Sequence, residues 1–266
     1  NTISDIYSTV VVGSDQVWRP AMTQEFALAY FLSFLAPTCR RISYAASFGV
    51  DYWQTKNLYT STDDIKKELS KFHSVSVRED SGVKICNDVF GVQATHVLDP
   101  TLLIGREFFE SIINQSGVET ASKKEIVFYK LDVDDRFKRQ VDNLCEHFNY
   151  SAENIYYKQV DNKYYFNSVS TWLKSLRDSK IIISDSFHCI CFAILFEKEF
   201  IYYPNKDRGM SRLESLLGQL GLKSRICNNL EQFKNYQSEI NYIDVNHKLN
   251  ELRKTSLSFL SSALKN

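Results

Sequence analysis

The stretch KIIISDSFHCICFAILF, residues 180–196, shows how this chain is built. Its apolar first part predicts a strand over Lys180–Ser184, and the residues that follow predict a helix over Asp185–Phe196. The small polar residues between the two elements can cap the helix. The stretch therefore indicates a strand that runs directly into a helix, which is the repeating unit of α/β proteins.

The same alternation of short apolar strands and amphipathic helices continues on both sides of this stretch and predicts a parallel α/β architecture. A polar, aperiodic segment over residues 114–124 indicates a domain boundary. We therefore predict a first Rossmann-like lobe over 1–115, a second over 116–245 and a terminal helix over 246–266. Two such lobes followed by a long helix match the plan of a GT-B-like transferase, and they equally fit other pairs of Rossmann-like domains. The predicted strands are Thr9–Val12, Arg41–Ala46, Ser74–Arg78, Thr95–Leu98, Ile126–Lys130, Asn154–Tyr157 and Phe200–Tyr203; the predicted helices are Ile65–Phe72, Ser81–Asn87, Glu107–Ile113, Asp135–Phe148, Ser168–Asp178, Ser211–Leu220 and Val245–Leu264.

The composition excludes several classes of protein. The 266 residues include 32 basic and 32 acidic side chains, so the formal net charge is zero and argues against a nucleic-acid partner. An anionic ligand must then be held by a local cluster of basic residues. Neither a GxGxxG turn nor a Walker A loop occurs among the 9 glycines.

No apolar run approaches the roughly 20 residues needed to span a bilayer. The 6 cysteines lack CxxC spacing, which favours reduced thiols and a cytoplasmic location. The histidines lack metal-binding spacing, so we expect neither a metal nor a cofactor.

The first candidate site follows the predicted strand Lys180–Ser184. In open α/β sheets, ligands bind beyond the carboxyl ends of the strands, where helix N-termini meet. Ser186 and His188 fall in the first turn of the predicted helix, where free amide groups and the helix dipole favour an anion. A histidine there could donate a hydrogen bond to phosphate or deliver a proton. A purely structural cap is an equally good interpretation of the pattern alone.

Two further groups of basic residues follow other strands. Arg208 and Arg212 lie after Phe200–Tyr203 and could clamp a doubly charged anion, or they could be a solvated pair on a surface turn. Arg78 ends the predicted strand Ser74–Arg78, and its alternative role is an ion pair with Glu79 or Asp80.

Near the N-terminus, Asp15 and Gln16 follow a strand and offer polar groups that suit the hydroxyls of a sugar. Ser47, after the strand Arg41–Ala46, would let a ligand approach the backbone. The aromatic residues Tyr156, Tyr157, Tyr164, Tyr165 and Phe166 are expected to serve packing and not to form a stacking platform.

These same regions make the sequence resemble the polysaccharide pyruvyl transferase family. The resemblance rests on several blocks that occur in the expected order along most of the chain. They are VVGSDQVW (11–18), ISYAASFG (42–49), SVREDSG (76–82), HVLDPTLL (96–103), ISDSFHCICFAILF (183–196) and RGMSRLESLLGQLGL (208–222). Members of this family have a GT-B-like fold. They transfer the enolpyruvyl carbons of phosphoenolpyruvate to two hydroxyls of a sugar, which forms a pyruvate ketal and releases phosphate.

The resemblance implies roles for the candidate residues. Arg78 would contact the carboxylate or phosphate of the donor, and His188 would act as the acid, with Ser186 beside it. Arg208 and Arg212 would neutralise the departing phosphate. Asp15, Gln16 and Ser47 would bind substrate, with Asp15 and Gln16 on the acceptor side.

The resemblance also implies the partners. The donor would be phosphoenolpyruvate, and the acceptor a sugar or a lipid-linked glycan precursor of the cell surface, such as an exopolysaccharide or capsule. The first lobe would bind the acceptor and the second the donor, in the cytoplasm or peripherally at the inner face of the membrane.

Two features depart from the family pattern. Cys189 stands where relatives often carry glycine. Relatives also carry further residues before the first block, so the N-terminal lobe is expected to be truncated. Two alternatives stay open. One is a GT-B glycosyltransferase that uses a nucleotide sugar, in which the same arginines and helix terminus would hold a diphosphate, and the other is a non-catalytic glycan-binding remnant.

Overall fold

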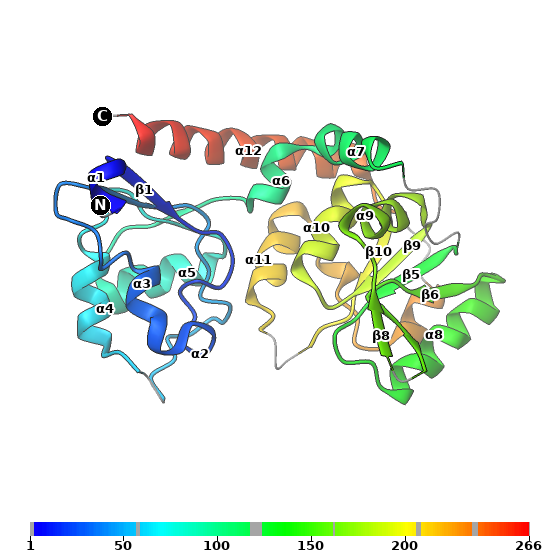
Figure 1. Ribbon diagram of the computed structural model, residues 1–266. Coiled ribbons are helices and arrows are strands. Elements are labelled where there is room, and N and C mark those ends of the chain that lie inside the picture. Colours follow the sequence, from blue (N-terminus) through cyan, green and yellow to red (C-terminus); the bar gives the residue numbers. More distant parts are fainter. Residues whose placement is uncertain are drawn as a thin grey trace. The chain divides into compact units, whose positions relative to one another are not determined.

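The computed structural model describes residues 3–56, 59–117, 124–161, 163–205, 209–235 and 239–265. Its internal contacts divide the chain into two compact units (Figure 1). Unit 1 contains residues 1–103, 206–220 and 246–266, and unit 2 contains residues 104–205 and 221–245. These borders fall elsewhere than those of the predicted domains, and the division into independently folding lobes stays a prediction.

Unit 1 is built on short parallel strands. β1 (Thr9–Val12) pairs in parallel with β2 (Arg40–Ser43), and β3 (Ser76–Val77) pairs in parallel with β4 (Thr95–His96). Parallel bridges from Ile42 to Ser74 and from Ala46 to Val77 join the two pairs, which gives the order β1-β2-β3-β4. The carboxyl ends of these strands therefore lie along one edge.

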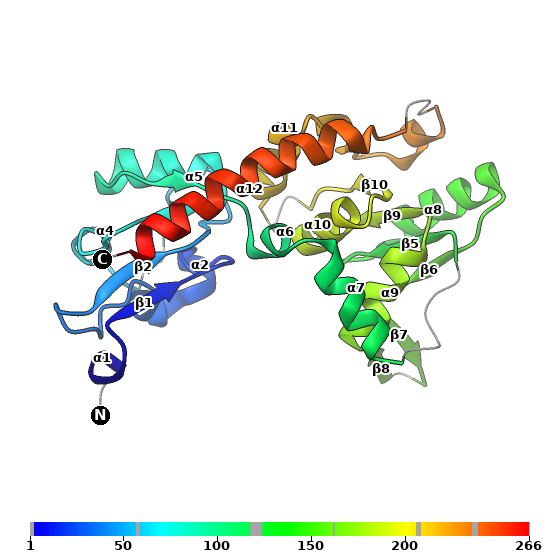
Figure 2. The same cartoon turned by 90° about the horizontal axis from the view of Figure 1, so that it is seen from above.

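The helices of unit 1 bury one aromatic core. Trp18 and Phe48 are almost completely buried there, and Trp18 stacks on Phe31 with ring centroids 5.1 Å apart. The helix α12 runs along the strands (Figure 2), because Arg40 donates to the carbonyls of Ala263 and Lys265 and Leu98 donates to Ser256. The helices are α1 (Ile3–Ile6), α2 (Pro20–Thr23), α3 (Ala27–Tyr30), α4 (Thr62–Leu69), α5 (Asp80–Ile85), α6 (Pro100–Ile104), α11 (Ser211–Leu220) and α12 (Tyr242–Leu264), the ends of α6 and α12 falling in unit 2.

Unit 2 contains a parallel sheet of the order β10-β9-β5-β6, with the bounds Glu199–Tyr202, Ile181–Ser184, Ile126–Tyr129 and Ala152–Asn154. Its central strand β9 is buried along its whole length, as its apolar sequence requires. On one face, Phe137 and Leu144 of α8 (Asp135–Phe148) pack against Ile181 and Ile183. Figures 1 and 2 show α9 (Val169–Asp178) and α10 (Phe187–Leu195) on the other side. Unit 2 also contains α7 (Arg106–Gln115).

The structure confirms the α/β class with parallel pairing, and it moves several predicted boundaries. The predicted helix over Asp185–Phe196 begins only at Phe187. The predicted strand Asn154–Tyr157 is wrong, because β6 ends at Asn154 and a separate antiparallel hairpin begins at Tyr157. That hairpin consists of β7 (Tyr157–Val160) and β8 (Lys163–Phe166). Among the described residues, every helix is too short or too polar to cross a bilayer.

Candidate functional site

In unit 1, the sequence-predicted residues gather beyond the carboxyl ends of β1, β2 and β3. Arg78 follows β3, and its side chain is only 1% exposed. Its guanidinium donates to Asp99 Oδ2 at 2.7 Å and to Asp15 Oδ1 at 2.9 Å. Arg212, at the start of α11, lies 3.5 Å from the same oxygen of Asp15. Two arginines and two carboxylates thus form one cluster.

Asp15 connects the two arginines because of its backbone. Its φ of 67° lies in the left-handed region, which short polar residues such as aspartate tolerate best. Half of its side chain stays accessible, at 57% exposure, although it contacts both Arg78 and Arg212. Asp15 therefore places a partly exposed carboxylate next to two largely buried guanidinium groups.

A buried carboxylate, Glu79, organises the loop after β2. Its Oε1 accepts hydrogen bonds from Ser47 Oγ at 3.0 Å, from Phe48 N at 2.8 Å and from Gly49 N at 3.1 Å. Burial raises the pKa of Glu79, while Arg78 and the donors to its oxygen oppose that shift. Ser47 is completely buried, so its hydroxyl builds this loop, and its predicted contact with substrate stays a prediction.

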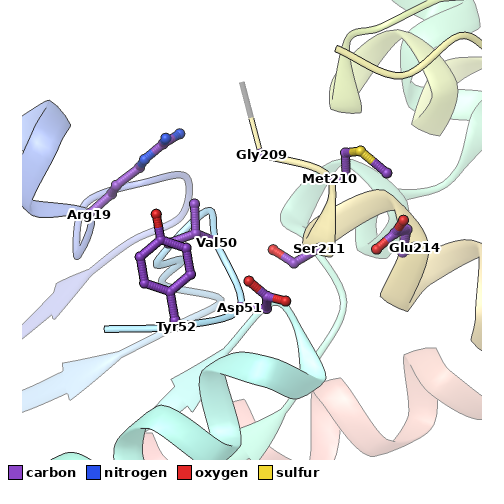
Figure 3. Close-up of a pocket in the computed structure, with 8 residues that line it drawn as sticks. All are labelled: Arg19, Val50, Asp51, Tyr52, Gly209, Met210, Ser211 and Glu214. Atoms are coloured by element: carbon purple, nitrogen blue, oxygen red, sulfur yellow. The ribbon is translucent and has the colours of Figure 1, made fainter. Parts of the chain in front are cut away.

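The loop after β2 is one wall of a pocket of about 450 Å³. Figure 3 shows Asp51 and Tyr52 on this loop, with Arg19 beside them and the start of α11 opposite. Gln16 Oε1 accepts a hydrogen bond from Arg19 Nη1 at 2.8 Å, so the predicted residue Gln16 positions a wall of the pocket. The complete lining is Arg19, Val50, Asp51, Tyr52, Gly209, Met210, Ser211 and Glu214.

Two glycines allow the pocket segments to approach one another. Gly209 has a φ of +81°, and a Cβ there would lie 2.0 Å from the carbonyl oxygen of Gly49. Gly49 has a φ of +73°, and a Cβ there would lie 2.2 Å from Gln16 Oε1. Because both positions exclude a side chain, Gly209 packs against the backbone of Gly49, and Gly49 packs against the side chain of Gln16.

The charges of the arginines respond differently to this environment. Burial, and then the charge of Arg78, lowers the pKa of Arg212 to about 10. Burial also lowers the pKa of Arg78, but the negative charges of Asp99, Glu79 and Asp15 outweigh this effect, so the pKa of Arg78 is raised overall. Burial lowers the pKa of Arg19. With a pKa of about 10, Arg212 still carries its positive charge at neutral pH.

In unit 2, the predicted residues Ser186 and His188 lie at the start of α10. Between Ile181 and Leu195 they are the only residues with partly exposed side chains, and the rest are buried. Ser184 Oγ accepts from Ser186 N at 3.0 Å and donates to the carbonyl of Tyr129 at 2.6 Å. The helix N-terminus therefore presents two polar side chains on an otherwise apolar element.

The neighbours of His188 are fixed in place. Asp185 does not cap the helix through its side chain; its Oδ1 accepts from Leu131 N at 3.2 Å, and its Oδ2 lies 3.5 Å from Lys130 Nζ. Cys189 is completely buried, and burial raises the pKa of its thiol to about 12. Although cysteine is larger than glycine, its side chain thus belongs to the core and not to the partly exposed surface of the helix.

Sequence reasoning found Asp15, Gln16, Ser47, Arg78 and Arg212, which the structure brings together in unit 1. Arg208 was also predicted, and it lies outside the described residues. The prediction missed Arg19, Glu79 and Asp99. Each of these stands in or directly beside a quoted block, and its polarity next to a strand end was a signal that could have been used.

The chain was compared with models of known protein families. The model described as polysaccharide pyruvyl transferase matches residues 2–207, which is more than half of the chain.

The chain belongs to the polysaccharide pyruvyl transferase family.

A comparison with curated proteins gave no match. The family assignment makes this pyruvyl transferase a transferase of polysaccharide biosynthesis. Its two groups of polar residues, around Arg78 in unit 1 and around His188 in unit 2, both lie at carboxyl ends of parallel strands. Among the described residues, no group of histidine, cysteine and acidic side chains has the arrangement of a metal site.

Proposed function

We propose that this protein transfers pyruvate from phosphoenolpyruvate to two hydroxyls of one sugar in a cell-surface glycan precursor. The family match carries this proposal, because the matched region contains both groups of candidate residues except Arg208 and Arg212. The GT-B-like arrangement of two Rossmann-like lobes, with acceptor and donor on different lobes, is part of the same proposal.

The proposed reaction begins with protonation of the donor. His188 gives a proton to the methylene carbon of phosphoenolpyruvate, which becomes a methyl group and leaves an oxocarbenium-like centre at the neighbouring carbon. A sugar hydroxyl attacks that carbon and loses its proton. The bond from the carbon to the phosphate oxygen breaks, and a second hydroxyl attacks the same carbon and loses its proton to close the ketal. Of the two hydroxyl protons, one restores His188 and the other leaves with the phosphate. Phosphate and one ketal are the products.

The basic residues would stabilise the charge that develops. Ser186 and the amide groups at the start of α10 suit an anion there. Arg78, Arg208 and Arg212 would act on the carboxylate and the departing phosphate, a kind of electrostatic stabilisation that often supplies most of a rate enhancement. In unit 1, Asp15 and Gln16 would contact the acceptor, and Ser47 would shape the loop beside it.

The site of unit 1 suits a polyhydroxylated acceptor. Its pocket combines the carboxylates of Asp51 and Glu214, the hydroxyl of Ser211, and the ring of Tyr52. Carboxylates accept hydrogen bonds from sugar hydroxyls, and an aromatic ring covers the apolar face of a pyranose. The pocket of about 450 Å³ lies within the range of small-molecule sites.

An acceptor screen tests the proposed function. The protein is incubated with phosphoenolpyruvate and a panel of sugars and lipid-linked glycans, and mass spectrometry measures the added pyruvyl group while phosphate release is followed in parallel. We expect equal amounts of ketal and phosphate with at least one acceptor. Thermal stabilisation by nucleotide sugars and not by phosphoenolpyruvate would contradict the proposal and favour a glycosyltransferase.

A further inference from the structure

The hairpin β7–β8 of unit 2 presents aromatic rings on one face. In its antiparallel register, Tyr157 lies opposite Phe166 and Gln159 lies opposite Tyr164. Directly opposed residues point to the same face, and so do residues two apart along a strand. Tyr157, Gln159, Tyr164 and Phe166 therefore share one face. Tyr164 is 57% exposed and Phe166 is 65% exposed, so contacts with neighbouring rings cover only part of the surface of each ring.

The aromatic face continues into a second pocket. The rings of Tyr164 and Tyr157 lie 5.0 Å apart, and those of Tyr157 and Phe166 lie 6.5 Å apart. The ring of Phe166 lies 5.6 Å from that of Tyr156, and the ring of Tyr156 lies 4.7 Å from that of Tyr129. The ring of Tyr129 lies 5.7 Å from the indole of Trp172, which ends the row. We call this row of rings the aromatic strip; its members are Tyr164, Tyr157, Phe166, Tyr156, Tyr129 and Trp172.

The pocket at the inner end of the strip has a volume of about 220 Å³. It is lined by four rings of the strip, by Ile155 and Val169, and by Asn167. Asn167 Nδ2 donates to the carbonyl of Ile155 at 3.0 Å, which fixes the orientation of its amide in the wall. A pocket that is mainly aromatic, with one oriented amide, fits a ligand that has an apolar face and a polar rim.

The strip ends beside the helix N-terminus that carries His188. Tyr129 is the last residue of β5, and its carbonyl accepts the hydrogen bond from Ser184 at the end of β9. The charge of Asp185, the residue before Ser186, contributes to the raised pKa of the Tyr129 hydroxyl. A ligand that follows the strip inward therefore reaches the carboxyl end of the sheet, the region where open α/β sheets bind ligands.

We propose that the aromatic strip binds a carbohydrate chain, with pyranose rings on the faces of Tyr164, Phe166 and Tyr156 and one sugar in the pocket. This inference rests on the proposed function, because it takes the chain to be the glycan acceptor.

The chemistry of the strip favours a carbohydrate as its occupant. Four of its six rings are tyrosines, which combine an apolar face with a hydroxyl at the edge. A pyranose ring has the complementary design, with C–H bonds on its faces and hydroxyls around its rim. Gln159, on the same hairpin face, and Asn167, in the pocket, add amide groups that can bond to those hydroxyls. Burial, mainly, raises the pKa of Tyr129 to about 12, so its hydroxyl keeps its proton at neutral pH.

The opposite face of the same hairpin supplies a matched control. Tyr165 pairs with Lys158 on that face and is 55% exposed, nearly as much as Tyr164. Tyr164→Ala and Tyr165→Ala therefore remove the same side chain from neighbouring positions with similar exposure. Only the first removal shortens the aromatic strip.

Calorimetric titration with cello-, galacto- and chito-oligosaccharides of increasing length tests the proposal. We expect at least one series to bind more tightly as the chain lengthens, and Tyr164→Ala to weaken that binding about tenfold or more. Tyr165→Ala should leave the affinity unchanged, and Tyr164→Phe should keep most of it because the ring face remains. Circular dichroism and the melting temperature of each variant verify that the hairpin and unit 2 stay folded.

Three results would overturn the proposal. One is no binding by any series, and another is equal affinity losses in Tyr164→Ala and Tyr165→Ala. The third is a dimer in light scattering that Tyr164→Ala dissociates, which would make the strip an interface between copies of the chain. The strip and the proposed function can fail separately: unchanged ketal formation on long acceptors by a variant that lacks Tyr164 contradicts only the strip, whereas oligosaccharide binding without any ketal contradicts only the function.

Discussion

The guanidinium of Arg78 donates to Asp99 at 2.7 Å, and both side chains are 1% exposed. Asp99 also accepts from the amide of Thr101 at 2.9 Å, which fixes the carboxylate at the start of α6. Arg78 is thus held by a buried ion pair with Asp99. Its second partner, Asp15, is partly exposed. This geometry suits a residue that holds the partly exposed carboxylate of Asp15 in place.

Replacement of Asp99 by alanine should strongly destabilise unit 1. It removes the buried carboxylate to which Arg78 is hydrogen-bonded, and loss of one member of a buried ion pair costs about 3–5 kcal/mol. Asp15→Ala removes a carboxylate that is 57% exposed, so we expect a loss of only about 0–1 kcal/mol. Urea denaturation followed by circular dichroism measures both. Equal losses for the two variants would show that Arg78 depends on both partners to the same extent.

Replacement of His188 should remove activity and leave stability almost unchanged. If this histidine is the acid, His188→Ala and His188→Gln should both lower ketal formation by about 10²–10⁴-fold, the usual contribution of general acid catalysis. Because the His188 side chain is partly exposed, its removal opens no cavity in the core. Pyruvyl transfer measured by mass spectrometry and the melting temperature give the two readouts. Wild-type turnover in either variant would exclude the acid role.

A methyl group at position 209 should disrupt the pocket of unit 1. In Gly209→Ala the new Cβ would meet the carbonyl of Gly49, whereas Gly91→Ala introduces a Cβ with nothing within 4 Å. Both glycines have a positive φ, at +81° and +69°, so both variants carry the conformational cost of about 1–2 kcal/mol. We expect Gly209→Ala to lose more stability than Gly91→Ala and to raise the KM for the acceptor. Similar stabilities and an unchanged KM would mean that the two segments separate without consequence.

The stability of unit 1 should fall in mild acid because of His96. Burial lowers the pKa of His96 below its ordinary value of 6.5. Its Nε2 lies 3.0 Å from the carbonyl of Arg78 and 3.5 Å from Ser215 Oγ. Since the unfolded chain binds the proton more tightly, the stability that the neutral ring provides above pH 6.5 is lost as the pH falls through the lowered folded-state pKa.

The variant His96→Gln tests this dependence. Glutamine keeps a polar group at the contact but does not titrate, so its melting temperature should change less between about pH 7.5 and pH 5 than that of the wild type. The amide of Gln219 on α11 also lies beside this ring, which makes a polar replacement suitable. If the melting temperatures of wild type and variant fall equally between these pH values, the acid sensitivity belongs to groups other than His96.

Much of the fold was predictable because its signals are local. The helices Asp135–Phe148 and Ser211–Leu220 have the predicted bounds, since the amphipathic periodicity that indicates a helix lies within each segment. The hairpin β7–β8 was missed for the opposite reason. Its aromatic and apolar residues are largely exposed, and therefore they do not follow the pattern of buried apolar residues from which a strand is normally predicted.

The sequence by itself determined the α/β class and the family, and it named most of the residues that gather at the candidate site of unit 1. Strand and helix patterns act over a few neighbouring positions, and the family blocks keep their order along the chain. The tertiary structure alone decided how those residues are used: that Arg78 is enclosed by Asp99 and Asp15, that Glu79 holds the loop of Ser47, and that Tyr164 is exposed while Cys189 is buried. Burial and the choice of an ionic partner depend on segments far apart in the sequence, and they are settled only when those segments pack together.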